Sequence, residues 1–142
     1  MSSPSDRLLV ALLDTIVPVS GSMPGAGTHG LAPSVVADAA DTHLETGLAA
    51  VLDALPAGFA EAAQAGRETA LRAVAEYQPA DIAAVVNLIY TAYYTDPDVL
   101  ALIEKRTGYH AGPPQPRGYE LPLFDAAALA RTQQSAPIWR ET

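Results

Sequence analysis

The first candidate for a binding or catalytic site along this chain is a glycine-rich run. Gly25 to Gly30 reads GAGTHG and matches the pattern G-x-G-x-x-G letter for letter. In dinucleotide-binding proteins this pattern follows a β-strand and opens a helix, whose N-terminus receives the pyrophosphate. Here a segment of helical spacing ends at Pro18, and Glu45 and Asp53 fall inside another helical segment, so the acid expected after a second strand is missing. The run therefore predicts an interhelical loop in which glycines allow a tight turn, and no cofactor site.

Histidines and carboxylates are too far apart in the sequence to indicate a metal site. His29, His43 and His110 could in principle join Asp41 or Glu45 around a metal ion, but only His43 and Glu45 are near one another. Residues two positions apart on a helix face different ways, and zinc ligands are usually spaced more densely. We expect no metal and place the histidines on the surface or in loops. His110 stands apart because tyrosines and prolines surround it.

No nucleophile is accompanied by the groups that would activate it. The chain has no cysteine, which excludes disulfides and thiolate catalysis, and no serine lies in an elbow motif with a paired histidine. Asp96 and Asp98 are interpreted as charges in the first turn of a helix. The sequence thus predicts no catalytic residue.

The elements that must position these residues all have helical spacing. Asp96-Pro97 predicts a cap and first turn, and Gly108 a residue just past a helix end. No stretch alternates apolar and polar residues at period two for long enough to indicate a strand. We predict an all-α fold, a small bundle of about five helices with a proline- and tyrosine-rich C-terminal extension. The expected helices cover 3–16, 33–55, an alanine-rich stretch at 59–76 that Gly66 could divide, a segment opened by Pro79 with a stripe from Ile82 to Tyr93, and 97–107.

Charge and hydropathy exclude several classes of partner. The chain has 142 residues, 49% of them hydrophobic, and a net charge of −8. Residues 1–66 contain one basic residue, Arg7, against seven acids, which argues against nucleic acid and anionic membranes. The apolar run Leu8–Leu13 is too short to cross a bilayer, and the N-terminal residues lack the pattern of a leader. We expect no membrane insertion and a cytoplasmic location.

Aromatic residues gather between Tyr90 and Tyr119, which hold five of the six tyrosines beside two proline turns. The spacing of Tyr90 and Tyr93 predicts that both are half buried in the core. Residues 1–108 are expected to form the helical domain, and residues 109–142 a proline-rich tail that docks on that domain or on a partner. Large amphipathic rings beside rigid turns favour a protein interface. The interface candidates are Tyr94, Tyr109, His110, Arg117, Tyr119, Trp139 and Arg140.

Five short segments occur in an order that resembles a known family. They are LLDTIVP followed by PGAGTHGL, then LIYTAYYTDPDVL, then GYHAGPPQPRGYE, and a closing PIWR. The chain resembles the gluconate 2-dehydrogenase subunit 3 family over nearly its whole length. That family comprises small subunits that accompany large flavin-bearing oxidoreductases of the glucose-methanol-choline type.

The resemblance implies an all-α, non-catalytic accessory subunit that binds and stabilises a large FAD-dependent sugar or alcohol oxidoreductase subunit. FAD and the substrate site would lie in the partner, and this chain would have no activity alone. Family members are often periplasmic and exported with a twin-arginine leader, sometimes with a cytochrome as a third subunit. This chain has neither that leader nor a cysteine, which makes a cytoplasmic complex plausible.

Two other functions fit the residues. A self-assembling helical protein would pair its aromatic face with a second copy of itself. An independent small-molecule binder or enzyme would use the loop around His29 or a pocket near His110.

Overall fold

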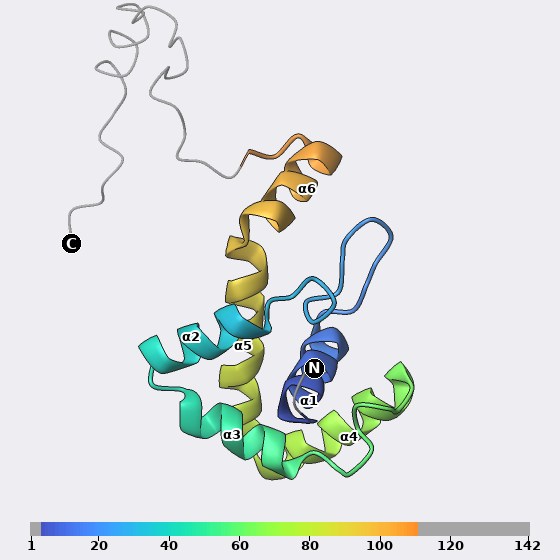
Figure 1. Ribbon diagram of the computed structural model, residues 1–142, viewed down its shortest axis with the longest axis vertical. Helices are drawn as coiled ribbons and strands as arrows, with labels where there is room; N and C mark the ends of the chain where they lie inside the picture. The colour runs from blue at the N-terminus through green and yellow to red at the C-terminus, as the bar shows by residue number, and fades with distance from the viewer. Residues whose placement is uncertain (1–3, 111–142) are drawn as a thin grey trace, which may run out of the picture. The chain divides into compact units, whose positions relative to one another are not determined.

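The computed structural model describes residues 4–110, and these form six α-helices without a β-strand (Figure 1). The predicted all-α fold is confirmed. The helices are α1 (Pro4–Ile16), α2 (Ala32–Asp41), α3 (Glu45–Ala54), α4 (Gln64–Tyr77), α5 (Pro79–Thr95) and α6 (Pro97–Thr107).

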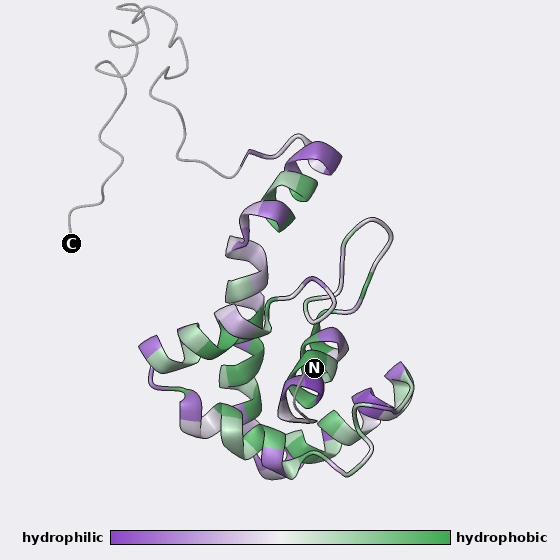
Figure 2. Cartoon of the chain, viewed as in Figure 1, coloured by the Kyte–Doolittle hydropathy of each residue, from purple (hydrophilic) through white to green (hydrophobic). Residues whose placement is uncertain are grey.

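Helix α5 is the axis of the fold because every other helix packs against it. Its buried residues recur three and four positions apart, so one side of the helix enters the core along its length. Figure 2 shows this apolar part of α5 where the neighbouring helices surround it. The buried residues of α5 are Val85, Leu88, Ile89, Ala92 and Tyr93. Within residues 4–110, no helix has the length and apolar character needed to cross a membrane.

The segment 33–55 was expected to form one helix, and this prediction is wrong. The helical conformation is interrupted between α2 and α3 at His43, which adopts a positive φ of 59°. The amide of Leu44 donates to the carbonyl of Ala39 and that of His43 to Ala40, which is the Schellman pattern of a helix end. Glycine or asparagine usually marks such an end, so the sequence offers only a weak signal here. The break turns the expected five helices into six.

The alanine-rich helix begins later than the predicted residue 59. Phe59 lies in a turn, where its amide donates to the carbonyl of Pro56, and its side chain is among the most deeply buried. Burial of this large ring holds the turn in place, and α4 starts only at Gln64. Gly66 does not divide α4, which runs through it.

The ends of α6 are where the sequence predicts them. The Asp96 carboxylate accepts hydrogen bonds from the amides of Asp98 and Val99, which satisfies two donors of the first turn. At the other end Gly108 has φ of 72°, and its amide donates to the carbonyl of Glu104. Glycine adopts this left-handed conformation without steric cost.

Candidate functional site

The glycine-rich run predicted to be a turn lies between two helices and is held against α1. The Asp14 carboxylate accepts hydrogen bonds from the amides of Gly27 (2.8 Å) and Thr28 (2.9 Å) and from the Thr28 hydroxyl (2.8 Å). At Gly27 the loop approaches the backbone of α1 so closely that a Cβ atom would collide with the Val10 carbonyl oxygen. Glycine is therefore required here by the close approach of two backbones.

Tyr93 joins the same loop to α5. Its side chain is only 2% exposed, and its hydroxyl donates a 2.8 Å hydrogen bond to the carbonyl of Pro24. Burial raises the pKa of the Tyr93 hydroxyl, and the neighbouring Tyr94 and Asp96 raise it further. The hydroxyl therefore stays protonated as a hydrogen-bond donor. Tyr93 is one of the two tyrosines expected to lie in the core, and its burial confirms that expectation.

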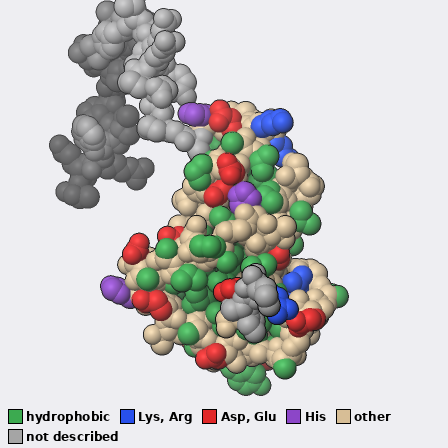
Figure 3. All heavy atoms as spheres, viewed as in Figure 1, with side chains coloured by type: hydrophobic (Ala, Val, Ile, Leu, Met, Phe, Trp, Pro, Cys, Tyr) green, Lys and Arg blue, Asp and Glu red, His purple; other side chains and the backbone are tan. Residues whose placement is uncertain are grey.

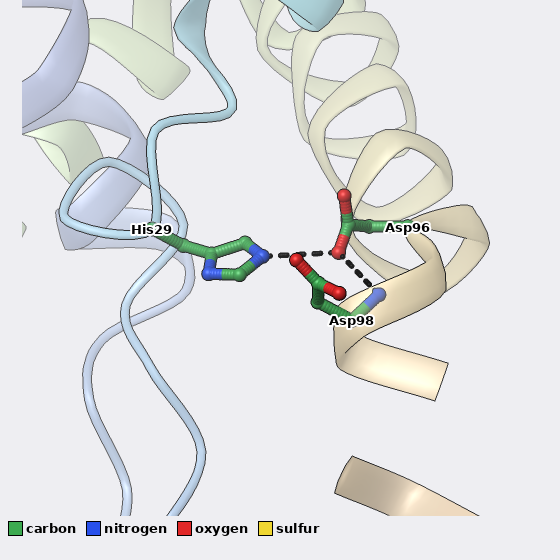
Figure 4. A group of neighbouring side chains, drawn as sticks. All are labelled: His29, Asp96 and Asp98. Carbon is green, nitrogen blue, oxygen red and sulfur yellow. Dashed lines mark hydrogen bonds and ion pairs between the residues drawn. The ribbon is translucent and has the colours of Figure 1, made fainter. Parts of the chain in front are cut away.

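A third contact joins the loop to the start of α6. His29 Nε2 lies 3.0 Å from Asp96 Oδ1, and both side chains are about one-fifth exposed, at 19% and 21%. Figure 4 shows the imidazole of His29 reaching from the loop toward Asp96, with Asp98 beside it. Because an ionised carboxylate only accepts hydrogen bonds, Nε2 carries the proton.

The environment of Asp96 favours its charged form. Burial by itself would raise the pKa of this carboxyl, but hydrogen bonds from His29, Val99 and Asp98 and the charge of His29 outweigh it, so the pKa is lowered. The contact with His29 thus adds to the capping role of Asp96 at α6.

His29, Asp96 and Asp98 each offer one potential metal-ligand atom, and these atoms lie within 4.8 Å of one another. No pattern in the sequence relates these three residues, because His29 and Asp96 are 67 positions apart. The same Asp96 oxygen already accepts from His29 and from the amides of Asp98 and Val99. The hydrogen-bonded geometry explains the cluster as a structural contact that fixes the loop on α6.

We call the contacts made by Asp14, Tyr93 and the His29–Asp96 pair the loop clasp.

Two further tyrosines of α5, Tyr90 and Tyr94, lie close to Tyr93 or to each other. Tyr94 is 53% exposed, and its ring meets the Tyr93 ring edge-on, with centroids 5.2 Å apart. Tyr90 is 41% exposed, one helical turn before Tyr94, with 6.2 Å between ring centroids. We call Tyr90 and Tyr94 the tyrosine face of α5.

Tyr90 does not pack against the hydrophobic core, so the prediction that it lies partly in the core is wrong. The buried stripe of α5 follows Leu88, Ile89 and Tyr93, which turns position 90 away from the other helices. Tyr94 projects off the stripe, as the sequence indicates.

The remaining interface candidates fall into two groups. Tyr109 is exposed, and His110 is exposed with Nδ1 3.1 Å from the Glu104 carboxylate. Both follow the end of α6. The other four, Arg117, Tyr119, Trp139 and Arg140, lie outside the described residues.

Comparison with known proteins gives no match for this chain, whether against protein-family models, curated proteins or solved structures. The loop clasp and the tyrosine face are therefore interpreted from their own geometry. In the described part of this all-α protein, the loop clasp joins the glycine-rich loop to α1, α5 and α6, and the rings of Tyr90 and Tyr94 are exposed on α5.

Proposed function

We propose that this chain is a non-catalytic small subunit that binds and stabilises a large FAD-dependent oxidoreductase subunit acting on a sugar or alcohol. The observation that carries the proposal is the tyrosine face. Two large rings stand exposed next to each other on the central helix, where a monomer would usually place polar residues.

Tyrosine is suited to this role because its ring buries much area on binding and its hydroxyl still finds a polar partner. Tyrosine is also among the residues that carry most of the binding energy in protein interfaces. Tyr94 packs on Tyr93, which the hydrogen bond to Pro24 holds in place. The ring therefore has less conformational freedom to lose on association, which favours affinity.

The chemistry in this proposal belongs to the partner. FAD would be held by the large subunit, together with the substrate site. The motifs that resemble the gluconate 2-dehydrogenase subunit 3 family support this assignment of the chemistry to the partner, since they include the YYTDP segment, which contains Tyr94 of the tyrosine face. Tyr109 and the candidates beyond residue 110 would extend the contact, with Arg117 and Arg140 as charged groups at its edge.

The experiment that tests the proposal is purification of the tagged chain from its own cells at near-physiological salt. We expect a yellow complex with flavin absorbance that contains a much larger flavoprotein. A colourless preparation that contains this chain alone would overturn the proposal. If that preparation were a dimer that persists on dilution, self-assembly through the aromatic face would replace it.

A further inference from the structure

A groove of about 500 Å³ lies between α2 and α5. Its apolar part is formed by Leu44, Ala84 and Leu88, and the carboxylates of Asp38 and Asp41 border it on the α2 side. Thr91 lines it on α5. A site with an apolar base and acidic border suits a ligand that carries both an apolar group and a cation.

The charge around this groove is of one sign. Residues 8–66 contain no lysine or arginine, and neither does α5. Within residues 4–110, Asp38 and Asp41 form no ion pair. Figure 3 shows acidic and apolar side chains together at the left edge of the molecule, over α2 and α3, with Lys and Arg gathered elsewhere on this face. The groove thus has two carboxylates that a basic partner could pair with.

The groove is also continuous with the tyrosine face. Thr91 follows Tyr90 directly and lies three residues before Tyr94, so the two surfaces adjoin along α5. A partner that covers the tyrosines would reach the groove without any rearrangement of the helix.

We propose that this groove binds a helical segment of a partner protein that carries arginine beside leucine. A third helix fits between two helices when its side-chain ridges enter their groove. Leucine would occupy the apolar part near Leu88, and arginine would pair with Asp38 and Asp41 while its methylene stem covers apolar surface. The proposal adds a second surface to the tyrosine face, and it does not depend on the partner being a flavoprotein.

The test uses the full chain and a fluorescein-labelled helical peptide of Arg, Leu and Ala, with Arg and Leu repeated at four-residue spacing. Binding is followed by fluorescence anisotropy at physiological salt. We expect the peptide to bind the wild-type chain, and a peptide with Glu in place of Arg not to bind. The double variant Asp38→Asn and Asp41→Asn should weaken binding about tenfold or more, because both partners of arginine are neutralised.

The matched control is the double variant Asp53→Asn and Glu61→Gln, which removes the same charge at two exposed positions outside the groove. It should change affinity by less than about twofold. Thr91→Trp fills the groove without changing charge and should also weaken binding about tenfold. Thr91 and Asp41 are exposed and Asp38 is half-buried, so these variants are expected to fold, which circular dichroism verifies.

Three results would each overturn the proposal. They are the absence of binding to the wild-type chain, equal losses in the two charge variants, and full binding by a folded Thr91→Trp variant. If the yellow complex formed equally well with all these variants, the proposed function would be supported and only the proposal about the groove would be rejected.

Discussion

Tyr93 and Tyr94 are neighbours on the same helix and have opposite environments. Tyr93 is buried, and its hydroxyl bonds to the loop that precedes α2. Tyr94 is 53% exposed and shares its ring contacts with Tyr93 and Tyr90. The same residue type thus stabilises the fold at Tyr93 and is exposed to solvent at Tyr94.

The comparison extends to the polar groups around the two tyrosines. In the loop clasp, Asp14 and Asp96 accept hydrogen bonds from named donors, so a lost partner leaves a partly buried group unsatisfied. Beside the tyrosine face, Asp38 and Asp41 border an open groove. Substitutions in the clasp should therefore change stability, and substitutions on the tyrosine face or in the groove should change binding.

The largest effect on stability is expected from Gly27→Ala. The added methyl group would collide with the Val10 carbonyl oxygen, a backbone atom that cannot move without displacing α1. We expect a loss of about 3 kcal/mol in the free energy of unfolding, measured by urea titration.

The matched control for Gly27→Ala is Gly66→Ala in α4. A Cβ atom at Gly66 meets nothing closer than 3.7 Å, and alanine is the better helix former. This variant should be more stable than wild type by about 0.5 kcal/mol. Equal stability of the two alanine variants would show that the loop does not need its close approach to α1.

A smaller effect is expected when single hydroxyls are removed from the two neighbouring tyrosines. Tyr93→Phe deletes the donor to the Pro24 carbonyl and should cost about 1 kcal/mol in the free energy of unfolding. Tyr94→Phe removes an exposed hydroxyl and should leave stability unchanged. If the two variants had the same stability by urea titration, the division of α5 into a folding side and a binding side would be wrong.

The smallest effect is the pH dependence that arises from Asp96. Since the folded state lowers the pKa of this carboxyl, its contribution is fully present above the unfolded value of about 3.9. It is lost as the pH falls through the lower folded value. Asp96→Asn retains an amide side chain that can cap α6. We expect thermal unfolding to show a weaker destabilisation between about pH 5 and pH 3 in this variant than in wild type.

The control for the pH experiment is Asp98→Asn, which changes the exposed neighbour of Asp96. This variant removes the same charge but leaves the His29–Asp96 contact in place, so it should not reproduce the effect of Asp96→Asn. If both variants changed the slope of stability against pH by the same amount, the effect would arise from the negative charge at the start of α6 and not from the His29–Asp96 contact.

Local signals in the sequence predict much of the fold. The all-α class follows from spacing alone, and the ends of α6 follow from Asp96-Pro97 and Gly108, because caps act over a few residues. The break at His43 could not be predicted in this way, since a histidine in a left-handed conformation has no distinctive pattern. The late start of α4 depends on burial of Phe59, which is a tertiary effect.

The candidate sites show the same limit. The sequence separates Tyr94 from the buried stripe but misplaces Tyr90, because the exact rotation of α5 is set by the helices around it. His29 and Asp96 come together only after the chain has folded, and no local pattern relates them. The acidic groove likewise requires α2 to end at Asp41 beside α5.

The central claim is that the tyrosine face binds the partner, and flavin retention by tyrosine variants tests it most directly. The chain is purified from its own cells as wild type, as Tyr90→Ala with Tyr94→Ala, and as Tyr77→Ala. Tyr77 is a suitable control because it is 85% exposed and ends α4, away from the tyrosine face. We predict that the double variant folds but retains about tenfold less flavin absorbance per chain, and that Tyr77→Ala retains all of it. Full flavin retention by the double variant would contradict the account.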